Sequence, residues 1–194
     1  AGFDPIEFIP GAWPADMPPV LHLTDGAPAN PRVPVEMRLQ GPLDAILDTL
    51  TPTHHGDGWD DGEIAALRAR IRAIYEPTGS TFGCASAVET MAGALPTTTR
   101  LAVDAGAHMF AVFGLWPATE PFGALKSNGL STMGYALPAA IASKLADPAT
   151  DVVAVTGDGG LSMCLAELAT AKELNLDITV CVMNDAALAL IDVK

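Results

Sequence analysis

The chain has 194 residues, of which 10 are Lys or Arg and 23 are Asp or Glu, so its formal net charge is −13. Hydrophobic residues make up 49% and charged residues 17% of the chain, which is typical of a folded domain with a sizeable core and not of a disordered chain or a coiled coil. The acidic excess leaves no basic surface for phosphates, so we expect no nucleic acid and no membrane among the partners.

Three cysteines, Cys84, Cys164 and Cys181, are scattered without a CxxC pair, a pattern typical of free thiols in a reducing compartment. The sequence has no apolar run long enough to span a bilayer, and its N-terminus lacks the pattern of a signal peptide. We therefore expect a cytoplasmic protein. Because the chain starts at Ala1 without an initiator Met and stops at Lys194 inside a helical pattern, we also expect it to be part of a longer protein.

The first part of the chain predicts one strand and one helix. The apolar run 20–23 is closed by turn formers and predicts a strand, and residues 43–50 have the apolar spacing of a surface helix. Turn-forming and acidic residues are concentrated in 51–62, which predicts a linker. We therefore expect three parts: a first domain over 1–55, a linker and leading helix over 56–74, and a second domain over 75–194.

The second domain alternates short apolar runs with helical patterns. Strands are predicted over 101–103, 152–155 and 178–183, and helices over 63–75, 86–95, 133–145 and 161–174. The strands are apolar throughout and not only at every second position, as in a parallel sheet that is covered on both faces. The pattern predicts an α/β fold, with a parallel sheet and helices on both of its faces.

The most informative segment follows the predicted strand 152–155, where Gly157-Asp158-Gly159-Gly160 leads directly into a helical pattern. Ligands of parallel α/β sheets bind at the carboxyl ends of the strands, and glycines let the backbone approach them closely. Asp158 would repel a phosphate unless a hard divalent cation lay between them. The alternative is that Asp158 only caps the helix that follows.

The next predicted strand ends in Asn184-Asp185, and this favours the cation site. Neighbouring parallel strands end at the same edge of a sheet, so Asp185 would lie beside Asp158. Two carboxylates, a loop carbonyl, diphosphate oxygens and water would complete the octahedron that Mg²⁺ requires. We therefore predict a magnesium site at this edge.

These residues resemble the cofactor motif of the thiamine diphosphate-dependent 2-oxoacid decarboxylase and carboligase superfamily, in which Gly-Asp-Gly is followed by an Asn-Asn or Asn-Asp pair. Asp185 follows Asp158 by 27 positions, an interval usual in that family. The resemblance implies that Mg²⁺ is bound by the side chains of Asp158 and Asp185 and by the backbone carbonyl of Ala187. It also implies that the glycines of the motif contact the cofactor, namely Gly157, Gly159 and Gly160.

Two further segments are similar to acetolactate-synthase-like members of the superfamily. Residues 129–141 resemble a segment whose Met, here Met133, supports the cofactor in a bent conformation, while backbone groups of Ser131 and Met133 hold its pyrimidine. Residues 104–108 resemble the loop that contacts the diphosphate, which implies roles for Ala105, Gly106 and His108. Ala107 stands where the family usually has Gln.

The resemblance also implies an activity and partners. Residues 2–8 resemble a segment of the Rossmann-like central domain, so residues 1–55 would be the end of that domain. The expected reaction is decarboxylation of a small-molecule 2-oxo acid, with pyruvate favoured, and carboligation to a second carbonyl compound. The family's catalytic Glu comes from an N-terminal pyrimidine-binding domain of the same or a partner subunit, in a homodimer or homotetramer, so the catalytic residue is unknown here. Neither Glu89 nor Glu167 is a credible replacement.

Two other functions stay open from the residues alone. The chain could be a non-catalytic subunit or assembly partner that keeps the cofactor fold, with Phe110, Phe113, Leu115 and Trp116 at a subunit interface. It could also belong to an unrelated flavin or nicotinamide enzyme, which would hold a chromophore. Magnesium-dependent binding of thiamine diphosphate, and its loss on Asp158→Ala, would separate the first hypothesis from both alternatives.

Overall fold

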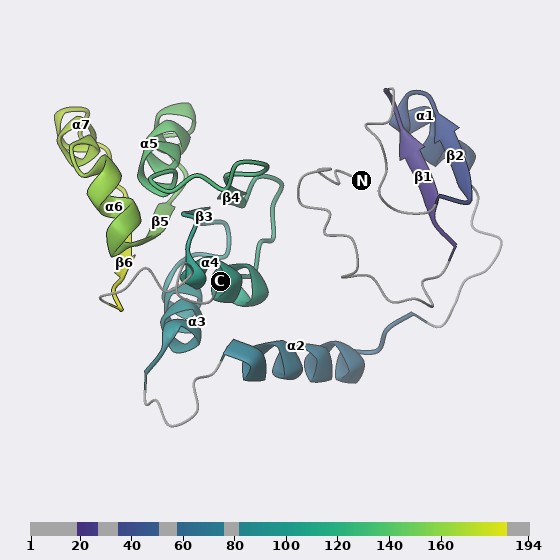
Figure 1. The fold of residues 1–194 in the computed structure, drawn as a ribbon, viewed down its shortest axis with the longest axis horizontal. Coiled ribbons are helices and arrows are strands. Elements are labelled where there is room, and N and C mark those ends of the chain that lie inside the picture. Colours follow the sequence, from purple (N-terminus) through teal and green to yellow (C-terminus); the bar gives the residue numbers. More distant parts are fainter. Residues whose placement is uncertain (1–18, 27–34, 51–57, 76–81, 186–194) are drawn as a thin grey trace. The chain divides into compact units, whose positions relative to one another are not determined.

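The computed structural model describes residues 19–26, 35–50, 58–75 and 82–185 (Figure 1). The chain divides into two compact units, residues 1–58 and residues 59–194, and each is described by itself. The expected segment 2–8, the linker residues 51–57 and Ala187 lie outside the described residues. The described helices include none that is long and apolar enough to cross a membrane.

The first unit contains two short parallel strands and one helix. Strand β1 (Leu21–Thr24) pairs in parallel with β2 (Met37–Gln40), and Leu21 lies opposite Met37. Helix α1 (Leu43–Thr49) contacts both strands. The sequence analysis predicts β1 and α1 but misses β2, although residues 37–40 have the alternation of apolar and polar residues that is typical of a strand.

The second unit is a four-stranded parallel sheet with helices packed on it (Figure 1). The strand order is β4-β3-β5-β6, and every neighbouring pair is parallel. In chain order its elements are α2 (Asp61–Tyr75), α3 (Cys84–Ala94), β3 (Arg100–Val103), α4 (Ala107–Leu115), β4 (Ala124–Lys126), α5 (Ala136–Ala146), β5 (Val152–Gly157), α6 (Asp158–Cys164), α7 (Glu167–Glu173) and β6 (Thr179–Met183).

Alternate residues of the two central strands face opposite layers of helices. Leu101, Val103, Val153 and Val155 are fully buried against Val88 of α3 and Val112 of α4. The residues between them, Ala102, Val152 and Ala154, pack against α5 through Ala136 and Ala140. Helix α7 joins the second layer beside α5. The prediction of an α/β fold with helices on both faces of a parallel sheet is confirmed, because successive side chains of a strand point to opposite faces.

Several elements of the second unit differ from the sequence-based expectation. The single helix expected over 161–174 is two helices, α6 and α7, and the first begins already at Asp158. The helix expected from Met133 begins at Ala136, so Met133 lies in the turn before it. Helix α4 and strand β4 were not expected, because α4 is apolar on every side and β4 has only three residues.

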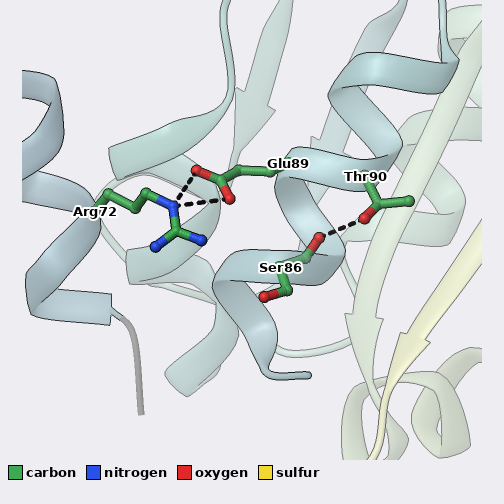
Figure 2. Close-up of polar contacts among 4 residues, drawn as sticks. All are labelled: Arg72, Ser86, Glu89 and Thr90. Carbon is green, nitrogen blue, oxygen red and sulfur yellow. Dashed lines mark hydrogen bonds and ion pairs between the residues drawn. The ribbon is translucent and has the colours of Figure 1, made fainter. Parts of the chain in front are cut away.

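Helix α2 belongs to the second unit, where it contacts α3 and α4. The side chain of Arg72 donates hydrogen bonds from Nε to both carboxylate oxygens of Glu89 on α3, at 2.8 and 3.0 Å (Figure 2). Within α3, the hydroxyl of Thr90 donates a hydrogen bond to the backbone carbonyl of Ser86 (Figure 2). Glu89 is therefore engaged in an ion pair between helices, which agrees with its exclusion as a catalytic group.

The three cysteines are free and half-buried. Burial raises the pKa of the thiols of Cys84, Cys164 and Cys181, and in Cys84 the neighbouring Cys181 raises it further. A thiol with a raised pKa is a poor nucleophile at neutral pH. The cysteines therefore act as small apolar groups of the fold.

Candidate active site

The carboxyl ends of β5 and β6 lie side by side at one edge of the sheet. The two strands are parallel neighbours, and their last residues, Gly157 and Met183, are paired in register. Asp158 directly follows β5, and Asp185 follows β6 by two residues. The structure therefore brings the two predicted metal ligands to the ends of adjacent strands at the same edge of the sheet.

The start of helix α6 excludes the capping alternative for Asp158. The N-cap residue of α6 is Gly157, and no side chain makes a capping hydrogen bond there. Asp158 is the first residue of the helix and is half-buried. A carboxylate in the first turn is favoured by the helix dipole, and it stays available to a ligand because capping does not occupy it.

His108 lies beside this edge, buried and with an unused nitrogen. It is the second residue of α4, and not part of a loop as expected, and only 8% of its surface is exposed. A Cβ atom built on Gly106 would lie 2.6 Å from its Cε1, and one built on Gly157 would lie 3.5 Å from it. The ring therefore packs on the backbone of both glycines, and its Nε2 is buried without a hydrogen-bond partner.

The charge state of His108 follows from its surroundings. Burial lowers the pKa of the imidazole below its usual value, and the carboxylates of Asp104 and Asp185 oppose part of this shift. The end of β6 lies near this histidine, because a Cβ atom built on Gly157 would lie 3.5 Å from Cε1 of His108 and 3.9 Å from the backbone oxygen of Met183. The ring is therefore mostly neutral at pH 7, and its open Nε2 can form one hydrogen bond with a ligand.

The predicted pyrimidine-binding residues lie in the irregular segment between β4 and α5. Ser131 has a left-handed backbone, with φ of 47°, which costs a non-glycine residue about 1 kcal/mol. The hydroxyl of Ser127 accepts a hydrogen bond from the backbone N–H of Thr132 at 3.1 Å, which closes this turn. Met133 is half-buried, whereas Leu130 is 85% exposed. The turn thus presents Met133 and the Ser131 backbone just before α5.

Asp104 is the residue that sequence reasoning missed. It directly follows β3 and is fully buried. Its Oδ1 accepts hydrogen bonds from the backbone N–H groups of Ala105 (3.1 Å) and Tyr135 (3.0 Å). Its Oδ2 accepts from the N–H of Gly134 (3.0 Å) and the hydroxyl of Thr156 (2.8 Å). Three of these four partners are 30 to 52 positions away in the chain, so only the fold reveals these contacts.

The residues at this edge fit a diphosphate held through a divalent cation. None of the predicted site residues is Lys or Arg, so an anion needs a metal ion, backbone amides and neutral donors here. The described residues contain no group of three or more His, Cys, Asp or Glu that could bind a metal alone. Two carboxylates completed by a carbonyl and ligand oxygens are the pattern by which Mg²⁺ binds with phosphates. The Nε2 of His108, which is buried without a partner, leaves one hydrogen-bonding position open beside them.

Comparison with known families agrees with this geometry. Residues 104–194 match the family described as thiamine pyrophosphate enzyme, C-terminal TPP binding domain. This part of the chain, slightly less than half of its length, is therefore similar to that family. The match begins at Asp104 and includes every predicted site residue of the thiamine diphosphate (TPP) motif.

Curated relatives extend the similarity toward the N-terminus. The chain is 38% identical to the acetolactate synthase isozyme 1 large subunit of Escherichia coli (strain K12) over 104 residues, which cover 54% of this chain and 18% of the relative. It is 28% identical to the isozyme 2 large subunit of the same organism over 178 residues, which cover 89% of this chain and 31% of the relative. The probable acetolactate synthase large subunit of Methanocaldococcus jannaschii is 34% identical over 93 residues, which cover 48% of this chain and 16% of the relative. The chain thus spans less than a third of the length of these enzymes.

Proposed function

We propose that the full-length protein is a thiamine diphosphate- and Mg²⁺-dependent enzyme of the acetolactate synthase type. It decarboxylates a 2-oxo acid, with pyruvate favoured, and joins the product to a second carbonyl compound. The observation that carries the proposal is the pairing of Gly157 with Met183, because it brings Asp158 and Asp185 to the ends of adjacent strands. The family match over residues 104–194 and the names of the curated relatives support it.

Each site residue has a proposed role toward the cofactor. The side chains of Asp158 and Asp185 and the backbone carbonyl of Ala187 bind Mg²⁺, which neutralises the diphosphate. Ala105, Gly106 and His108 contact the diphosphate, and Ser131 and Met133 hold the thiamine end. The glycines that let the backbone approach the cofactor are Gly157, Gly159 and Gly160.

When bound, thiamine diphosphate supplies the electron sink for breaking the bond between the carboxylate and the carbonyl carbon of the substrate. The chain itself binds and orients this group, and such positioning can lower a barrier by up to about 7 to 11 kcal/mol. The resemblance to this family leads us to assign proton transfer to a Glu of an N-terminal pyrimidine-binding domain, from the same or a partner subunit of a homodimer or homotetramer. Glu89 does not replace it, because it is paired with Arg72.

The domain organisation belongs to the same proposal. We assign residues 1–55 to the end of a Rossmann-like central domain, 56–74 to the linker with its leading helix, and 75–194 to the thiamine diphosphate and Mg²⁺ domain. The boundary between the two compact units, after Gly58, supports a division in this region. Helix α2 nevertheless packs with the second unit.

Calorimetric titration of thiamine diphosphate into the full-length protein, with and without Mg²⁺, tests the proposed site. We expect magnesium-dependent binding that Asp158→Asn weakens by about a hundredfold, because it removes a charged metal ligand. The matched control is Asp151→Asn, which removes the same charge at the opposite end of β5 and should bind the cofactor as the wild type does. Equal binding by Asp158→Asn and the control would contradict the site.

Product analysis with pyruvate tests the reaction. We expect the loaded wild-type protein to release CO₂ from pyruvate and to form acetolactate, and Asp158→Asn to lose both products. A protein that binds the cofactor with Mg²⁺ but leaves pyruvate and other 2-oxo acids unchanged would contradict the proposed reaction while leaving the cofactor site in place.

A further inference from the structure

We propose that Asp104 is the positioning residue of this site: its buried carboxylate fixes the turn that carries Ser131 and Met133 to the ends of β3 and β5. The inference rests on the proposed function, since it concerns the same cofactor site. It adds a residue whose contacts are to the backbone of the site and not to a ligand.

The contacts of Asp104 join three of the four segments that are proposed to hold the cofactor and its metal ion. Its own segment, which continues into α4 and His108, is held through the N–H of Ala105. The turn after β4 is held through the N–H groups of Gly134 and Tyr135, the two residues that directly follow Met133. Strand β5 is held through the hydroxyl of Thr156, two residues before Asp158. One side chain thus fixes the spacing between these segments.

The chemistry of the four contacts requires a carboxylate. Four donors converge on two oxygens, and an ionised carboxylate is the side chain that accepts hydrogen bonds at both oxygens without presenting a donor. Asparagine has the same shape, but its NH₂ group would face an N–H donor. The amides of Gly134 and Tyr135 also lie at the N-terminus of α5, where the helix dipole favours a negative charge.

The turn that Asp104 holds needs such an anchor. Gly129, Ser131 and Gly134 all have left-handed backbone conformations, with φ of 79°, 47° and 77°. Irregular backbone of this kind has no ladder of hydrogen bonds to keep its shape, so neighbouring groups must fix it. Ser127 closes one side of the turn and Asp104 holds the other.

A contribution to stability alone does not explain why a carboxylate is buried at position 104. A buried charge costs desolvation energy, and an apolar side chain of similar volume often stabilises a fold equally well. The absence of a side chain at Gly160 also makes room for the carboxylate, because a Cβ atom at this position would overlap Oδ2 of Asp104. The arrangement keeps the carboxylate, the turn and the start of α6 in contact, which places Met133 relative to Asp158.

Asp104→Asn in the full-length protein tests the proposal, with Val88→Ala as a control for stability. Val88 is fully buried in α3 and contacts none of the three segments through hydrogen bonds that the structure describes, so its truncation lowers stability only. In the cofactor-free protein, hydrogen exchange of the segment 129–136 should accelerate in Asp104→Asn and not in Val88→Ala. The dissociation constant for thiamine diphosphate with Mg²⁺ should rise about ten- to a hundredfold in Asp104→Asn alone.

Equal cofactor affinity in Asp104→Asn and Val88→Ala, or unchanged exchange of the segment 129–136, would overturn the proposal. If wild-type protein binds no thiamine diphosphate, the proposed function fails, and the exchange experiment still tests whether Asp104 holds the turn. If Asp104→Asn does not fold, amide hydrogen exchange measured residue by residue in the wild-type protein tests the proposal. Amides of Gly134 and Tyr135 that exchange as slowly as those of β5 support the anchor, and amides that exchange as fast as that of Leu130 refute it.

Discussion

Gly160 is the position where one added methyl group would disturb the site most. Its Cβ would overlap the Asp104 carboxylate and lie 2.9 Å from the hydroxyl of Thr156. We expect Gly160→Ala to lower the free energy of unfolding by about 1 to 3 kcal/mol, because a buried, hydrogen-bonded carboxylate must move. Denaturant unfolding of the full-length protein measures this change.

The matched control is Gly93→Ala in helix α3. A Cβ at Gly93 meets no atom within 4 Å, so only the helix propensity changes. This variant should be stabilised by up to about 1 kcal/mol. If Gly160→Ala is as stable as the wild type, or is stabilised as Gly93→Ala should be, the close contact of Gly160 with Asp104 does not exist in solution.

The buried His108 predicts a pH dependence of stability. Its pKa is lowered in the folded protein, mainly by burial, so below about pH 6.5 the unfolded chain binds more protons than the folded one. The free energy of unfolding should therefore fall as the pH drops through this value, until the folded-state pKa is reached. We expect His108→Gln to lose this part of the fall, as measured by melting temperature between about pH 8 and pH 5.5. Parallel pH profiles for the variant and the wild type would contradict a buried, neutral His108.

At the scale of elements, the ion pair between α2 and α3 contributes little to stability. Arg72 and Glu89 are both more than a third exposed, at 36% and 39% of their side chains, so solvent screens their attraction. Glu89→Gln should cost less than about 1 kcal/mol, and it should leave turnover unchanged, because Glu89 points to Arg72 and not to the proposed site. Val88→Ala, at the neighbouring position, should cost about 2 kcal/mol because it empties part of the core.

Urea unfolding of Glu89→Gln and Val88→Ala measures the two changes in stability, and a pyruvate assay measures turnover. A loss of turnover in Glu89→Gln that exceeds its loss of stability would make Glu89 a functional residue, against the expectation from the sequence and the structure.

The sequence predicts the elements whose pattern is local. The strands of 152–155 and 178–183 are continuous apolar runs, and the helices near 43–50, 63–75 and 86–95 have a helical period, so the α/β fold follows from them. Helix α4 is apolar all round and gives no period. The break between α6 and α7 falls at Leu165 and Ala166, where no Gly or Pro marks it.

The sequence predicts the position of the candidate site but not all of its contacts. Asp158 and Asp185 were placed together because strand ends meet at one edge of a parallel sheet, and the register of β5 and β6 agrees with this. The burial of His108 and the hydrogen bonds of Asp104 could not be predicted, because they depend on segments that are distant in sequence. A lone Asp between an apolar strand and a Gly-containing turn gives no local signal of its partners.

At the scale of the whole molecule, the net charge affects how an anionic cofactor binds, and the division into two units affects which part of the chain the cofactor stabilises. The net charge of −13 opposes an anionic cofactor, so its binding must depend on a divalent cation. All described site residues lie in the second compact unit. Ligand binding stabilises only the cooperative unit that holds it, by about 2.7 kcal/mol at a hundred times the dissociation constant.

We therefore expect thiamine diphosphate with Mg²⁺ to slow hydrogen exchange in α4, β5 and α6 of the full-length protein, while β1, β2 and α1 exchange as before. Addition of EDTA should remove the protection, because the carboxylates of Asp158 and Asp185 then repel the diphosphate. Inorganic Mg²⁺ without the cofactor is the control, and it should protect weakly, since two carboxylates leave most of the coordination sphere to water. Protection that spreads equally to the first unit would mean that the two units unfold together. Protection that survives EDTA would mean that the chain binds the anion without a metal, against the charge of the site.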